Sequence, residues 1–193
     1  MDRFERRKQA SRQRILDAAL TLFRAKGMER TTIEEICVEA DVAARTFFNH
    51  FPRREDMVRA LAAERLRGVR DLLAEREGFD LVGFFDQVAD HLEASGEPYR
   101  ELVGAMLALT TGAERSGELF AIFLDVIKDG VARAEVTAAH DPLTLTDIVV
   151  GTLVAVLMNW TADDAYPLRT GLHDAAVALT DLLAPPKRTR RSR

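Results

Sequence analysis

Residues 31–52 read TTIEEICVEADVAARTFFNHFP, and they carry the most informative helical pattern of the chain. In its first part, apolar side chains recur at i, i+3, i+4 and i+7, which predicts a helix over 33–40. A second short helix is predicted over 43–51, because Pro52 cannot continue it. The break between them, at Asp41 and Val42, is tight. Two short helices joined in this way are typical of a helix-turn-helix.

The second of these helices has two chemically different faces. At about 100° per residue, Phe47 and Phe51 fall on one side and are expected to be buried. Arg45 and Asn49 fall on the opposite side and are expected to point outward. An arginine bonds guanine bidentately and an asparagine does so with adenine, so this face suits the major groove of DNA. The alternative is an ordinary solvated face.

An apolar stripe over 15–23 predicts a helix that precedes the pair and ends at Gly27. Thr31 and Glu34 then fit a capping box at the start of the next helix. Further along, turn residues separate long apolar-periodic segments, and no alternating strand pattern appears. The fold class is therefore all-α with about nine helices, the later ones predicted over 54–76, 79–94, 97–111, 115–138, 142–161 and 167–183.

Charge is segregated along the 193 residues. Residues 1–54 hold 12 Lys and Arg against eight Asp and Glu, whereas residues 55–186 hold 10 against 23. A basic first quarter on an acidic body suggests that the first quarter faces a polyanion. One cysteine excludes a disulfide framework, and Cys37 is interpreted as a core residue.

A soluble, cytoplasmic protein is expected. The longest nearly uncharged apolar stretch, 148–158, is shorter than the roughly 20 residues that cross a bilayer, so no membrane partner is expected. The charged start of the chain does not resemble a secretory signal. No cofactor is expected, and no metal site is expected because the four histidines lack metal-ligand spacing.

Residues 12–57 resemble the DNA-binding domain of the tetracycline-repressor (TetR) family, most specifically in the run ADVAARTFFNHFP at 40–52. The resemblance implies a basic arm (1–11), a three-helix DNA-binding domain (12–54), a helical effector-binding and dimerisation domain (55–184) and a disordered basic tail (185–193). It also implies a homodimeric regulator, most often a repressor, that binds a pseudo-palindromic double-stranded operator.

The resemblance further implies which residues contact DNA. Those expected to meet base edges or phosphates are Arg12, Thr31, Thr32, Ala44, Arg45, Thr46, Phe48, Asn49, His50 and Arg54. The N-terminal arm is expected to neutralise phosphates or to enter a minor groove. Three positions depart from the family pattern: Asp41 replaces the usual turn glycine, Ala43 a capping Ser or Thr, and Phe48 a tyrosine. These changes affect base readout rather than DNA binding itself.

The last two helices are the expected dimer interface, formed as a four-helix bundle with a second copy. Its expected residues are Gly151, Ala155, Leu172, Ala176, Leu179 and Leu183. The alternative is an intramolecular helix pair. A small, mainly apolar effector is expected to bind among Phe84, Phe85, Met106, Phe120, Phe123, Met158 and Trp160, although such residues at helical spacing also form plain cores.

Two other classes of function remain open from the sequence. One is a helical enzyme that uses Asp and His of the acidic body. The other is a non-catalytic interaction module with a degraded helix-turn-helix. No nucleophile arrangement, phosphate loop or carboxylate pair supports an enzyme, and Arg45, Thr46, Asn49 and Arg54 speak against degradation.

Overall fold

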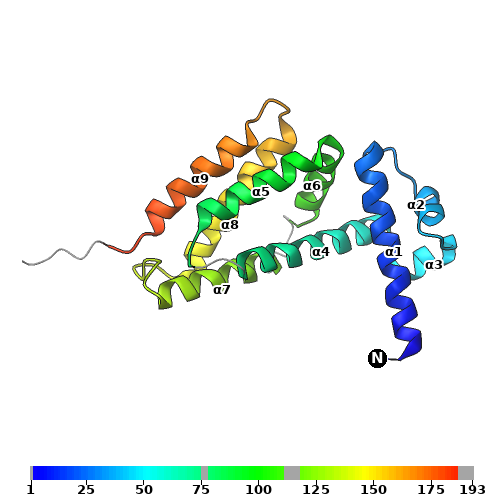
Figure 1. The fold of residues 1–193 in the computed structure, drawn as a ribbon, viewed down its shortest axis with the longest axis horizontal. Helices are drawn as coiled ribbons and strands as arrows, with labels where there is room; N and C mark the ends of the chain where they lie inside the picture. Colours follow the sequence, from blue (N-terminus) through cyan, green and yellow to red (C-terminus); the bar gives the residue numbers. More distant parts are fainter. Residues whose placement is uncertain (1, 75–77, 111–117, 187–193) are drawn as a thin grey trace, which may run out of the picture. The chain divides into compact units, whose positions relative to one another are not determined.

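A computed structural model describes residues 2–74, 78–110 and 118–186. Over these ranges the chain forms nine α-helices and no strand, which confirms the all-α expectation (Figure 1). The helices are α1 (Arg3–Lys26), α2 (Ile33–Glu39), α3 (Ala44–His50), α4 (Arg54–Ala74), α5 (Leu81–Ser95), α6 (Glu97–Thr110), α7 (Glu118–Ala132), α8 (Pro142–Ala162) and α9 (Leu168–Leu183). Most of the predicted tail, 187–193, lies outside the described residues.

The chain divides into two compact units, and the division differs from the expected boundary after residue 54. The first unit comprises Met1–Arg67 and His91–Ala113, so it includes α6 as well as the helix-turn-helix. The second comprises Gly68–Asp90 and Glu114–Arg193. Helix α6 belongs to the first unit because it packs directly against α1.

The first unit is built around the apolar stripe of α1. Ile15, Leu16 and Phe23 are fully buried there, and α2 and α3 pack beside this helix. Helix α1 begins at Arg3, so the expected basic arm, 1–11, is helical from that residue onward. Its residues from 3 to 10 are all exposed, because the apolar stripe begins only later in the helix.

The second unit packs α7, α8 and α9 against one another. Its core contains a cluster of three fully buried aromatic rings, Phe84, Phe85 and Phe123. Helix α9 is also tied to α5 through polar pairs: His173 Nδ1 lies 3.0 Å from Asp86 Oδ1, and Arg169 pairs with Asp90. These contacts set α5 and α9 side by side.

Among the described helices, α8 alone is long and apolar enough to cross a membrane by length and composition. The sequence expectation counted only 148–158, whereas the helix extends further in both directions with Asp147 as its single charge. The same length and composition occur in core helices of soluble proteins. One face of α8, including Leu145, Val149 and Leu153, is buried in the protein.

Candidate nucleic-acid interface

Helix α3 presents the two faces that its sequence predicts. Phe47 and Phe51 are buried, and their ring centroids lie 5.8 Å apart. Arg45 and Asn49 are exposed on the opposite side, and neither side chain makes a hydrogen bond or ion pair with any described residue. Their side chains therefore keep their full hydrogen-bonding capacity for another molecule.

The turn between α2 and α3 adopts the conformation expected from its residues. Asp41 has a φ of +50°, in the left-handed region that aspartate tolerates better than most residues. Arg14 of α1 braces this turn, since its Nη1 donates to the Asp41 carbonyl at 3.4 Å. Ala43 provides no side-chain cap for α3, which forgoes a bond worth about 1 kcal/mol.

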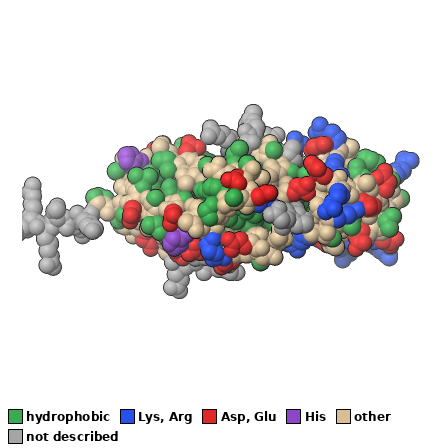
Figure 2. Space-filling view, turned by 90° about the horizontal axis from the view of Figure 1, so that it is seen from above, with side chains coloured by type: hydrophobic (Ala, Val, Ile, Leu, Met, Phe, Trp, Pro, Cys, Tyr) green, Lys and Arg blue, Asp and Glu red, His purple; other side chains and the backbone are tan. Residues whose placement is uncertain are grey.

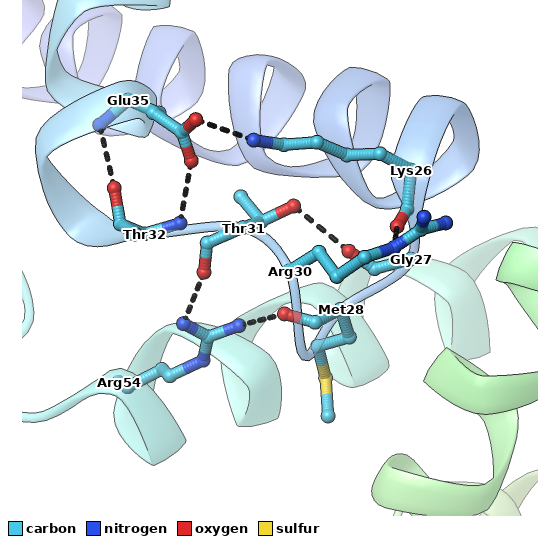
Figure 3. A network of polar contacts seen from close by, with 8 residues as sticks. All are labelled: Lys26, Gly27, Met28, Arg30, Thr31, Thr32, Glu35 and Arg54. Carbon is cyan, nitrogen blue, oxygen red and sulfur yellow. Dashed lines mark hydrogen bonds and ion pairs between the residues drawn. The ribbon is translucent and has the colours of Figure 1, made fainter.

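The predicted capping box is displaced by one residue. Thr32, not Thr31, is the N-cap of α2: its hydroxyl accepts from the Glu35 amide at 3.2 Å, and Glu35 accepts from the Thr32 amide at 2.8 Å. Lys26 also donates a hydrogen bond to the Glu35 carboxylate (Figure 3). This bond, and after it the bond from the Thr32 amide, lowers the pKa of Glu35 to about 2. Glu34 takes no part in the cap.

Thr31 does not face outward as the DNA-contact expectation required. Its side chain is 1% exposed, and its hydroxyl donates to the Gly27 carbonyl at 2.8 Å. The Thr32 side chain is exposed, and its hydroxyl proton is free to donate although its oxygen already accepts. Only the second of the two threonines is therefore available to a phosphate.

Arg54 also points inward, into the loop between α1 and α2 (Figure 3). Its Nη1 donates to the Thr31 carbonyl at 2.6 Å and its Nη2 donates to the Met28 carbonyl. The guanidinium lies 5.5 Å from the centre of the Phe23 ring. In this structure both Nη atoms of Arg54 are therefore bonded within the protein, and its phosphate contact stays a prediction.

The remaining expected DNA contacts lie around the exposed face of α3. Ala44 is exposed, Thr46 is half-buried, and Phe48 is 48% exposed with its ring packed edge-on against Phe47. Arg12 of α1 lies over the Phe51 ring, 5.2 Å from its centre. Burial first, and then the charges of Lys8 and Arg12, lower the pKa of His50 below its usual value.

Basic side chains gather over this part of the molecule. Figure 2 shows most of the Lys and Arg visible on that face over the part built from α1–α3, with acidic side chains interspersed. Four exposed cations, Arg3, Arg6, Arg7 and Lys8, lie on the first turns of α1. Four of the 12 Lys and Arg residues of the first 54 positions therefore lie near one end of one helix.

The residues expected to bind an effector are only partly together. The rings of Phe84 and Phe123 lie 5.6 Å apart and those of Phe84 and Phe85 lie 5.9 Å apart, each pair edge-to-face. In the same unit, Phe120 is half-buried and Trp160 is buried. Met158 is 49% exposed on α8, and Met106 belongs to the first compact unit.

The expected dimer residues divide into two sets. Leu172, Ala176, Leu179 and Leu183 of α9 are buried within the chain itself, so they are not available at the surface. Gly151 and Ala155 of α8 are exposed. A Cβ built on Gly151 meets no atom within 4 Å, which leaves open space over this part of the helix.

Two further residues of the first compact unit bear on the site, Cys37 and Glu101. Cys37 is buried as expected, and burial together with Glu34 raises its thiol pKa, which disfavours a reactive thiolate. Glu101 of α6 was not anticipated: its carboxylate accepts from the Met28 amide at 2.6 Å. The two residues are 73 positions apart, so no local pattern in the sequence signals this bond.

Comparisons with known proteins give one consistent result. Residues 15–61 match the family described as bacterial regulatory proteins, tetR family. The chain is 30% identical over 131 residues to the HTH-type transcriptional repressor KstR2 of Rhodococcus jostii, covering 67% of this chain and 56% of that protein. It is 40% identical over 53 residues to the regulator TcmR of Streptomyces glaucescens, covering 28% of this chain and 24% of that protein. The matched region thus spans about half, or less, of these relatives.

Solved structures share the fold at low sequence identity. FadR of Thermus thermophilus, a TetR-family repressor solved in complex with lauroyl-CoA, matches with a TM-score of 0.69 at 19% identity over 94% of this chain and 100% of that one. RolR, solved with resorcinol, matches with a TM-score of 0.65 at 22% identity over 93% of this chain and 90% of that one. The helical fold beyond the helix-turn-helix is therefore that of TetR-family structures.

Proposed function

Because the chain belongs to the TetR family of bacterial transcriptional regulators, we propose that it is a cytoplasmic, homodimeric repressor that binds a pseudo-palindromic DNA operator. A small, mainly apolar effector releases it from the operator. The observation that carries the proposal is the outward face of α3, where Arg45 and Asn49 stand free opposite the buried Phe47 and Phe51. Catalysis is not part of this function.

Base readout is assigned to α3 and phosphate binding to the residues around it. Arg45 and Asn49 suit guanine and adenine in the major groove, which admits a helix. Ala44, Thr46 and Phe48 flank them. Thr32 and His50 lie at positions that suit backbone contacts.

The N-terminal turns of α1 favour phosphate contacts over insertion into the minor groove. A helix with its side chains is about 10–12 Å wide, whereas the minor groove is about 6 Å wide. Since residues from Arg3 onward are helical, this segment as it stands does not fit that groove. Its exposed cations instead suit the outer surface of the DNA backbone, where each neutralised phosphate adds to the salt dependence of binding.

A dimer through the outer faces of α8 and α9 supports the two-fold symmetry of the operator. Ile148, Gly151, Ala155 and Met158 recur at helical spacing along the exposed side of α8. Small residues at Gly151 and Ala155 permit close approach of a second helix. On α9, Val177 and Leu182 supply further exposed apolar side chains. An apolar face of this kind on a soluble protein is typical of a protein interface.

The effector site is proposed in the second compact unit. The aromatic cluster of Phe84, Phe85 and Phe123, with Phe120 and Trp160 in the same unit, offers apolar and edge-to-face contacts to an apolar or aromatic molecule. Structural relatives were solved with resorcinol and with lauroyl-CoA, which supports an effector of partly apolar character. To act, the effector must bind the DNA-free state more tightly than the DNA-bound state.

Selection of bound duplexes from a random DNA library, at about 150 mM salt to suppress nonspecific phosphate binding, tests the proposal. Enrichment of a short palindrome is expected. Arg45→Ala is then expected to weaken binding by about 1–3 kcal/mol and to relax the preference at one base pair of each half-site. Lys128→Ala, which removes an exposed cation from α7, is the matched control and leaves affinity unchanged. A folded dimer that enriches no sequence refutes the function.

A further inference from the structure

The loop between α1 and α2 is bonded from two sides at a single residue, Met28. Helix α1 ends at Lys26 with Gly27 as its C-cap, and the next residue, Met28, donates its amide to the Glu101 carboxylate of α6 at 2.6 Å. The carbonyl of the same residue accepts from Arg54 at the start of α4. Met28 itself contributes only its backbone to both bonds, so the two charged side chains hold this residue between α6 and α4.

Arg54 also contacts the residue that precedes the N-cap of α2, Thr31 (Figure 3). Arg54 donates to the Thr31 carbonyl, and the Thr31 hydroxyl closes the loop onto the Gly27 carbonyl. The next residue, Thr32, is the N-cap of α2. A continuous series of short bonds therefore runs from Glu101 through Met28 and Arg54 to the helix that supports α3.

Helix α6, which carries Glu101, is packed firmly against the rest of the first compact unit. Tyr99 and Leu102 on this helix are buried within the first compact unit. The guanidinium of Arg24 on α1 lies over the Tyr99 ring, 5.3 Å from its centre. Because these contacts fix α6 against α1, the carboxylate acts as a fixed acceptor rather than as a mobile surface charge.

We infer that Glu101 is a positioning residue for DNA binding: its carboxylate fixes the loop at Met28 and so sets the placement of α2 and, through it, of α3. Arg54 acts with it as an internal brace. The inference rests on the proposed DNA-binding function. It assigns to α6, outside the helix-turn-helix in sequence, a direct part in shaping the DNA-binding surface.

Because Glu101 is negatively charged, the direction of the change in DNA affinity on its removal tests the inference. A carboxylate in the DNA-binding unit repels phosphates, so removing it raises DNA affinity if charge is its only effect. A positioning role predicts the reverse. Glu29 is an exposed carboxylate one residue beyond Met28 with no bond to any described residue, and Glu29→Gln is therefore the matched control.

The experiment measures anisotropy of the labelled duplex enriched by the wild-type chain, at about 150 mM salt. Glu101→Gln exchanges a charge-assisted acceptor for a neutral one and is expected to weaken binding roughly five- to thirtyfold, with Glu101→Ala weaker still. Glu29→Gln is expected to bind as wild type or slightly tighter. The salt slope of Glu101→Gln is expected to equal that of wild type, because no phosphate contact is lost.

Amide hydrogen exchange supplies a local readout that general destabilisation does not mimic. In the wild-type chain the Met28 amide is expected to exchange more slowly than those of Glu29 and Arg30, for which the described chain offers no acceptor. In Glu101→Gln the Met28 amide is expected to lose protection while amides in the core of α1 keep theirs.

Two negative outcomes are distinguishable. If the wild-type chain enriches no duplex, the proposed function fails. If it binds and Glu101→Gln binds within twofold of wild type or tighter, as Glu29→Gln does, the positioning role is overturned. An unprotected Met28 amide in the wild-type chain overturns it as well, independently of whether any variant folds.

Discussion

Gly27 is the position where a single methyl group most sharply tests the local structure. Its φ of +85° and ψ of +158° place it in a region of backbone space that is essentially restricted to glycine, and Gly27→Ala therefore introduces about 1–3 kcal/mol of strain. The added Cβ also lies 2.8 Å from Glu101 Oε2. The carboxylate can swing away, but it then releases the Met28 amide, whose charge-assisted bond contributes about 1.5–3 kcal/mol.

Partial relief of either effect leaves a net destabilisation of about 3 kcal/mol. In a chain of this length that corresponds to a fall of about 6–12 °C in Tm. Circular dichroism on heating, at fixed protein concentration, measures it. Glu29→Ala in the same loop is the control and is expected to lie within about 0.5 kcal/mol of wild type. A Gly27→Ala variant that melts within about 1 °C of wild type refutes this account of the loop.

Four further predictions concern acid sensitivity (two of them), the Arg54 brace and the core. The lowered pKa of Glu35 stabilises the fold above its unfolded pKa of about 4.5, and this contribution is lost as pH falls from there towards 2; urea unfolding of Glu35→Gln should therefore show lower stability at pH 7 and a shallower loss on acidification. The lowered pKa of His50 also makes the fold less stable as pH falls, because protonation below about pH 6.5 favours the unfolded chain. His50→Gln should therefore reduce the change in the free energy of unfolding between pH 7.5 and 5.5. Arg54→Gln should weaken operator binding without changing its salt slope, whereas a slope reduced by about one per site would restore Arg54 to the phosphate contacts. Phe123→Ala should lower the free energy of unfolding by about 3–5 kcal/mol, since the ring is fully buried, and a loss below 1 kcal/mol would contradict its place in the core.

Features that depend on neighbours along the chain could be predicted from the residues alone. Helical spacing identified the helices of the helix-turn-helix. The rotation of about 100° per residue placed Phe47 inward and Arg45 outward, as the structure has them. The left-handed turn at Asp41 followed from residue type. These features are local because helix periodicity and turn chemistry act over a few residues.

Other features could not be predicted from the sequence, because they depend on which residues from distant parts of the chain pack together. Thr31 and Thr32 have equal capping ability. Thr32 is the N-cap because the Thr31 hydroxyl bonds the Gly27 carbonyl and the Thr31 carbonyl accepts from Arg54. The apolar stripe of α9 is compatible with a partner subunit or with the chain's own core, and it packs inward at residues such as Leu172. The bond from Glu101 to Met28 joins segments 73 residues apart, and only the packing of α6 on α1 creates it. Periodicity specifies that a face is buried, but the partner that buries it is set by the long-range arrangement of the helices.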